Sequence, residues 1–253
     1  MPVYKATAIV LHRIHLGETD KIVTLLTREV GKLNAVAKGA RRLTSKLSGA
    51  TELFTYSRLL LAAGKSLDII SQCEIQESFP TLRSDLSLLA RASYLCELTD
   101  RLVQEREPNP EVFDLLLSAL YLLQRVRSNP DVILHAFELH LLAERGYAPE
   151  LERCVHCGRE LEPQGTRFSP LLGGMLCVQC RYAEKDSVPL SPKTRDWMRQ
   201  ILRLEPEEIV DVEISSDTEQ ELTRCLRWYI RHRAERDLKS AEFLEVLRVA
   251  GTV

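Results

Sequence analysis

Apolar and polar residues alternate along the first 80 residues of this chain, and the pattern changes after Pro80. Period-two alternation in short runs separated by glycine is typical of β-strands. The predicted strands are Tyr4–Leu16, Lys21–Thr27, Lys32–Lys38, Thr51–Ala62 and Leu67–Ile75. Five short strands in so few residues favour a small closed barrel. The OB fold has this number of strands, and an SH3-like barrel is the main alternative.

Beyond Pro80 the apolar residues recur every three or four positions, which is typical of amphipathic helices. Ser191 followed by Pro192 resembles a helix N-cap with proline in the first turn. The predicted helices are 82–102, 113–126, 130–145 and 192–202, followed by one long helical stretch from Asp217 to about Val249. The fold class is therefore α+β: a barrel over 1–80 and a helical domain over 81–253, with a small insert at about 151–188.

The amino-acid composition indicates a globular protein. The chain has 253 residues, of which 45% are hydrophobic, so it can bury a sizeable core. No apolar run approaches the ~20 residues that cross a bilayer, and the first residues lack the features of a signal peptide. The seven cysteines do not resemble a disulfide scaffold. We expect a soluble cytoplasmic protein without membrane association.

The net charge of -2 hides an uneven distribution. Residues 1–80 contain eleven Lys and Arg against seven Asp and Glu, whereas residues 81–150 contain seven against eleven. A module that binds a polyanion, joined to an acidic scaffold, has this asymmetry. An imbalance of four charges also arises by chance, so both interpretations stay open.

Four cysteines form two pairs, Cys154 with Cys157 and Cys177 with Cys180, and 19 residues separate the pairs. Two-residue gaps let both sulfurs of a pair turn toward one point, as tetrahedral zinc requires. Four thiolates leave no open position, so the spacing predicts a structural Zn²⁺ site. No βαβ pattern supports a redox pair, and no HxE sequence supports a zinc deaminase.

The stretch Gly31–Arg42 is rich in basic residues. In a strand, Lys32 and Lys38 share one face with Asn34, and Arg41 and Arg42 continue the positive charge into the next segment. This pattern suits contacts with phosphate. A solvated face and loop is the alternative.

A second basic run lies near the C-terminus, and there local ion pairs with Glu221 and Glu235 compete with a binding role. Its members are Arg224, Arg227, Arg231, Arg233, Arg236 and Lys239. The sequence contains no Gly-rich phosphate loop, no HExxH and no GxSxG, so no pattern indicates catalysis.

The stretch GKLNAVAKGARR, followed by helices and by CVHCG…FSPLLGGMLCVQC, resembles the RecO family of bacterial DNA repair and recombination mediators. The resemblance covers nearly the whole chain. It implies an N-terminal OB fold and a zinc-binding insert. It also implies binding to single- and double-stranded DNA, annealing of complementary strands without ATP, and a place at the bacterial nucleoid. The implied partners are RecR and single-stranded-DNA-binding protein, with RecA engaged indirectly.

By this resemblance Lys32, Lys38, Arg41 and Arg42 contact phosphate, and Cys154, Cys157, Cys177 and Cys180 bind structural zinc. Arg127 and the arginines near the C-terminus are candidates for the surface that receives the tail of single-stranded-DNA-binding protein. Two alternatives remain: a zinc-containing nuclease or nucleic-acid-modifying enzyme, and a zinc-ribbon transcription regulator.

Overall fold

A computed structural model describes residues 2–42, 44–126, 129–205, 208–209, 212–234 and 237–250. By its internal contacts the chain forms two compact units. One contains the residues up to Gln124 together with those from Leu238 onward, and the other contains Arg125–Asp237. The division into domains at residue 80 stays a prediction. Within the described residues, no helix has the length and apolar character needed to cross a membrane.

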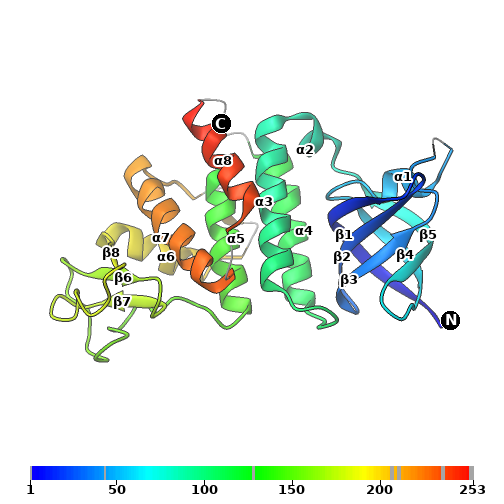
Figure 1. Ribbon diagram of the computed structural model, residues 1–253. Coiled ribbons are helices and arrows are strands. Elements are labelled where there is room, and N and C mark those ends of the chain that lie inside the picture. The colour runs from blue at the N-terminus through cyan, green and yellow to red at the C-terminus, as the bar shows by residue number, and fades with distance from the viewer. Residues whose placement is uncertain are drawn as a thin grey trace. The chain divides into compact units, whose positions relative to one another are not determined.

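The first unit begins with a closed five-stranded barrel (Figure 1). Its strands are β1 (Val3–Leu16), β2 (Asp20–Thr27), β3 (Gly31–Ala37), β4 (Tyr56–Ala62) and β5 (Asp68–Glu77). The order around the barrel is β1-β2-β3-β5-β4, and the long β1 closes it by pairing with both β2 and β4. This arrangement confirms the predicted OB-type barrel over the SH3-like alternative.

Strand alternation builds the barrel core. Leu33, Ala35 and Ala37 of β3 are at most 1% exposed, as the period-two pattern predicts. The predicted strand Thr51–Ala62 starts too early, because Thr51–Thr55 forms a turn in which the buried Phe54 has φ 72°. The segment after β3 also contains a one-turn helix, α1 (Leu47–Ala50), which the sequence pattern did not predict.

Helices α2 (Pro80–Ser84), α3 (Leu86–Leu102) and α4 (Pro110–Arg125) follow the barrel. A break at Asp85 divides the single helix that was predicted from residue 82, since the Asp85 carboxylate accepts a hydrogen bond from Leu88 N and caps α3. The last helix, α8 (Lys239–Val249), packs against α3 in the same unit.

The long helical stretch predicted from Asp217 to Val249 was wrong. The structure divides it into α7 (Ser216–Ala234) and α8, which belong to different units. Leu238 is extended and buried, and the Glu97 carboxylate accepts hydrogen bonds from the backbone N–H groups of Lys239 and Ser240. These contacts begin a new helix although the apolar period continues across the break.

The second unit contains α5 (Asp131–Glu144), α6 (Pro192–Ile201), α7 and a small sheet. The sheet order is β7-β6-β8, with β6 (Arg167–Ser169), β7 (Gly174–Leu176) and β8 (Val188–Pro189). Ser191 caps α6 through a hydrogen bond from Thr194 N, as predicted. The sheet lies in the stretch of the predicted insert, between α5 and α6.

Candidate metal centre and nucleic-acid interface

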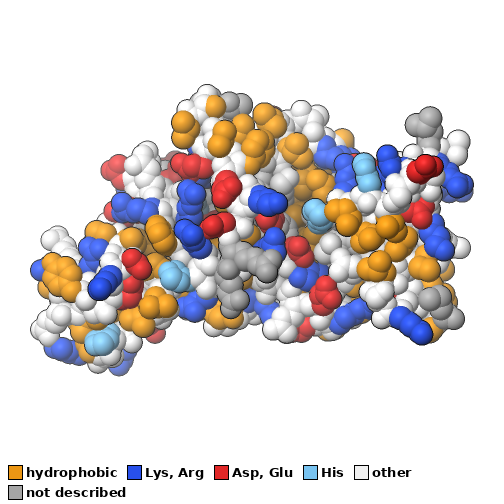
Figure 2. Space-filling view, in the orientation of Figure 1, with side chains coloured by type: hydrophobic (Ala, Val, Ile, Leu, Met, Phe, Trp, Pro, Cys, Tyr) orange, Lys and Arg blue, Asp and Glu red, His pale blue; other side chains and the backbone are white. Residues whose placement is uncertain are grey.

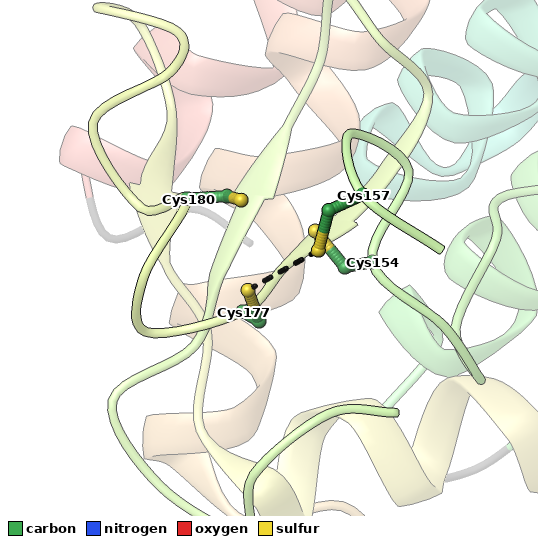
Figure 3. A group of neighbouring side chains, drawn as sticks. All are labelled: Cys154, Cys157, Cys177 and Cys180. Carbon is green, nitrogen blue, oxygen red and sulfur yellow. Dashed lines mark hydrogen bonds between the residues drawn. The ribbon is translucent and has the colours of Figure 1, made fainter. Parts of the chain in front are cut away.

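The four cysteines of the insert come together in space (Figure 3). Their sulfurs all lie within 4.8 Å of one another. Cys154 and Cys177 are buried, whereas Cys157 and Cys180 reach the surface. Figure 3 shows the two pairs on separate turns, with their sulfurs directed toward a common centre. The four residues can therefore hold a metal ion.

Local backbone geometry explains why these turns form. Gly158 has φ 71° and donates its N–H to Cys154 O at 2.8 Å, which closes the first turn in a conformation that glycine adopts without strain. Cys180 N donates to Cys177 O at 3.0 Å and closes the second turn. Val155 N donates to Met175 O at 2.9 Å and joins the first turn to β7.

Thiol ionisation in the cluster is uneven. A hydrogen bond from the Arg159 backbone lowers the pKa of Cys157 to about 6. Desolvation, together with the neighbouring sulfurs, raises the pKa of Cys180 to about 12. Thiolates packed this closely repel one another, so a bound cation is the partner that lets all four ionise. Soft sulfur donors in this number suit a structural zinc ion or an iron–sulfur cluster.

Lys32 does not project into solvent. Its ammonium is 3.1 Å from Asp100 Oδ1, and its side chain is only 12% exposed. Asn34 Nδ2 donates to Glu105 Oε1 at 3.0 Å, and a Cβ on Gly31 would overlap the backbone of Glu107. The connection between α3 and α4 therefore covers the outer face of β3 where the strand begins. In other OB folds the face of strands 2 and 3 binds oligonucleotides.

The other basic residues of this stretch lie at the opposite end of β3, about 20 Å away along the strand. Lys38, Arg41 and Arg42 are exposed, and we call these three residues the basic rim. Figure 2 shows one face of the barrel, on which Lys and Arg side chains surround apolar ones. Three of the four predicted DNA-binding residues thus lie together, and Lys32 lies apart from them.

The basic rim is attached to the loop between β1 and β2. Arg41 N donates to Thr19 O at 2.9 Å, and Arg41 Nη1 donates to Gly17 O at 3.0 Å. Gly39 N donates to Asp20 Oδ1 at 2.8 Å. This N–H, together with the Thr19 hydroxyl, lowers the pKa of Asp20, so the carboxylate stays charged. These bonds fix the backbone of the rim while the Lys38 and Arg42 side chains stay exposed.

One buried carboxylate in the first unit was not predicted from the sequence. Asp68 on β5 is fully buried and accepts hydrogen bonds from Arg106 Nη2 at 2.9 Å, from Gly64 N at 3.0 Å and from the Tyr4 hydroxyl. Burial raises the pKa of Asp68, but the hydrogen bonds outweigh burial and lower it overall. Arg106 N also donates to Lys32 O, so this cluster attaches the α3–α4 connection to the barrel.

We expect Arg106→Gln to lower the free energy of unfolding by about 2 kcal/mol, because Asp68 then stays buried without its cation. Asp68 has a lowered folded pKa, so its contribution is present above its unfolded pKa of ~4 and is lost as the pH falls through the folded value. Chemical denaturation at several pH values measures both effects. Arg28→Gln, which removes an exposed pair with Asp114, is the matched control. Equal free energies of unfolding for the two variants would contradict the stabilising role of the Arg106–Asp68 pair.

The basic residues on α7 differ in their surroundings. Arg233 lies over the rings of Tyr147 and Tyr229, with 5.2 Å and 5.0 Å from its Cζ to the ring centroids. Phe168 of β6 also packs edge-on against Tyr229, so Arg233 and Tyr229 attach the insert to α7. Arg224, Arg227 and Arg231 are exposed. Lys239 belongs to α8 in the other unit, whereas Arg127 and Arg236 lie outside the described residues.

Two family models match this chain. The model described as "Recombination protein O N terminal" matches residues 1–79, and "Recombination protein O C terminal" matches residues 83–242. The chain belongs to the RecO family. The RecO match includes both the barrel with its basic rim and the insert with its four cysteines, which confirms the resemblance seen in the sequence.

Curated relatives agree with this assignment. A DNA repair protein RecO of Symbiobacterium thermophilum is 43% identical over 252 residues, which cover 99% of this chain and 100% of the relative. One of a Roseiflexus species is 41% identical, covering 97% of this chain and 86% of the relative. One of Bacillus pumilus is 37% identical, covering 95% and 93%. This chain therefore belongs to a DNA repair and recombination family over nearly its full length.

Proposed function

We propose that this chain is a recombination mediator that binds single- and double-stranded DNA through the basic rim and anneals complementary strands. Membership of the RecO family supports this function. The observation that carries it is the exposure of Lys38, Arg41 and Arg42 beside the β1–β2 loop of an OB-type barrel. Loops at this position bind oligonucleotides in other OB folds.

Annealing on this surface needs no catalytic residue. Two strands repel each other through their phosphates, and a positive surface that neutralises both lowers the barrier to pairing. Base pairing then drives the reaction without a covalent step and without nucleotide hydrolysis. The absence of a Walker-type loop from the sequence agrees with an ATP-independent mechanism.

From its family we further propose that the chain acts with RecR to help load RecA onto DNA coated by single-stranded-DNA-binding protein. Such a role places it at the nucleoid in the bacterial cytoplasm. The surface that receives the tail of single-stranded-DNA-binding protein is proposed to be helical. Lys32 remains a proposed phosphate contact as well, but its ion pair with Asp100 makes it the weakest of the four candidates.

We propose that the metal of the four-cysteine cluster is zinc. Four sulfur donors within 4.8 Å leave no position for water or substrate, which is the arrangement of a structural site. A bound Zn²⁺ would join the two turns to each other, and all four ligands lie in the insert. The bound ion would stabilise the fold of the insert and would take no direct part in DNA binding.

The mediator and its rivals differ in how they treat DNA. The expected result is salt-dependent binding of single strands and duplexes of unrelated sequence with similar affinities, because phosphate contacts carry no sequence information. Fluorescence anisotropy with labelled oligonucleotides measures this binding. DNA incubated with the protein and Mg²⁺ should stay intact on a denaturing gel. Strong preference for one sequence would support a transcription regulator, and cleavage would support a nuclease.

A further inference from the structure

An exposed tryptophan lies between two arginines on the outer face of α7. Trp228 is 41% exposed, and the Arg231 guanidinium lies over its ring, with 5.7 Å from Cζ to the ring centroid. Arg224 is exposed one turn before Trp228. Positions four and three apart share one side of a helix, so we call Arg224, Trp228 and Arg231 the α7 face.

The packing of α7 does not account for this exposure. The buried stripe of the helix is made by other residues, namely Thr218, Leu222, Cys225, Leu226, Tyr229 and Ile230. Trp228 lies outside that stripe. Tryptophan is highly buried on average, and an exposed aromatic ring among arginines is a common feature of binding surfaces.

The C-terminal part of α7 carries positive charge. Residues 222–234 contain four arginines and no acidic residue. Glu221, the acid that precedes them, accepts hydrogen bonds from Ser191 N and Thr194 Oγ1 at the start of α6, which lowers its pKa although burial alone would raise it. The pair of Arg231 with Asp237 spans 3.0 Å, but both side chains are more than half exposed. A pair this exposed is weak, and a polyanion can displace it.

We propose that the α7 face binds single-stranded DNA, with one unpaired base stacked on Trp228 and the neighbouring phosphates contacted by Arg224 and Arg231. The two arginines are about 10 Å apart along the helix axis, which suits phosphates on either side of a stacked base. Stacking on aromatic rings is tolerant of sequence, and Arg adds a cation–π contact. A duplex would not fit, because its base faces are already stacked inside it.

This inference rests on the proposed DNA binding and adds a second contact surface, in a different compact unit from the basic rim. An acidic peptide could form ion pairs with the arginines, but ion pairs alone do not explain the exposed flat face of Trp228. Stacking of a base uses both the ring and the charges. The face therefore favours a single strand over a protein partner.

Tryptophan fluorescence reports the stacking directly. The chain has two tryptophans, and the other, Trp197, is only 7% exposed. In the full-length Trp197→Phe variant, whose single tryptophan is Trp228, a thymidine oligonucleotide should quench the emission, and the same sequence in a duplex should quench it much less. In the Trp228→Phe variant the oligonucleotide should leave the emission of Trp197 unchanged.

Binding of the same oligonucleotide, measured by anisotropy, gives the second readout. Trp228→Leu, which keeps an apolar side chain, should weaken binding about tenfold, and Trp228→Tyr should retain most of the affinity. Arg224→Gln together with Arg231→Gln should lower the slope of log affinity against log salt by about 1.4. Arg203→Gln, at an exposed arginine after α6, should change the slope little and serves as the control.

The possible failures are distinguishable. If the unmodified protein binds DNA but Trp228 is not quenched and the α7 variants bind normally, the inference is wrong and the proposed function stands. If the unmodified protein binds no DNA, both are wrong. If an Asp-rich peptide quenches Trp228 and the oligonucleotide does not, the face belongs to a protein partner and the inference is overturned.

Discussion

Replacing Lys38, Arg41 and Arg42 together by alanine is expected to weaken binding of single-stranded DNA about 100-fold at about 0.1 M salt. Each phosphate contact on a single strand contributes about 0.7 to the salt slope, so losing three lowers the slope by about 2. The difference from the unmodified protein should shrink as the salt concentration approaches about 1 M, because counterion release then gains little. Anisotropy titrations over a series of salt concentrations measure the slope.

The matched control removes three charges elsewhere. Lys5 on β1, Arg58 on β4 and Arg203 after α6 are exposed and lie outside the basic rim. Their joint replacement by alanine changes the net charge equally and should leave most of the slope in place. If the salt slope falls equally in both triple variants, the overall charge of the protein attracts DNA and the basic rim has no special role. An unchanged slope in the rim variant would contradict the phosphate assignment outright.

Replacing Cys154 by serine is expected to remove the metal and unfold the insert. Three remaining thiolates bind zinc far more weakly, and in small metal domains the free energy of metal binding is also the free energy of folding. Atomic absorption should show less than one zinc per chain. Limited proteolysis should cut within the insert, while the barrel resists because its core is separate.

His156→Ala is the control for this experiment. His156 lies between two of the cysteines and is exposed, but it is not part of the four-sulfur cluster. The variant should keep its metal and its resistance to protease. One zinc per chain in Cys154→Ser would show that the ligand set is wrong. Iron in place of zinc in the unmodified protein would contradict the proposed metal but not the ligands.

The features that were predictable from sequence are those that depend on short spacings. The two-residue gaps between cysteines bring the sulfurs of each pair onto one turn, and alternation in β3 specifies which side chains enter the barrel. Ser191 and Thr194 are three residues apart, so the N-cap of α6 was also predictable. In each case the sequence itself contains both partners of the interaction within one element or turn.

Contacts between distant residues were not predictable. Lys32 looks like a solvent-facing strand residue, but its partner Asp100 is 68 positions away. Arg106 and Asp68 are 38 positions apart, and neither is unusual in its own sequence context. The end of α7 was missed for a related reason, because the apolar period continues across the break and a contact with Glu97 starts α8. At these positions tertiary contacts determine the structure, and the local sequence pattern does not indicate them.

We propose that a positive surface on this chain brings complementary strands together. The most direct test mixes two complementary oligonucleotides, one coated with single-stranded-DNA-binding protein, with the full chain and without ATP, and follows duplex formation by fluorescence. We predict faster annealing than without the chain, a gain that fades as salt rises, and little gain with the Lys38, Arg41 and Arg42 triple variant. Equal annealing rates with and without the chain at low salt would contradict the account.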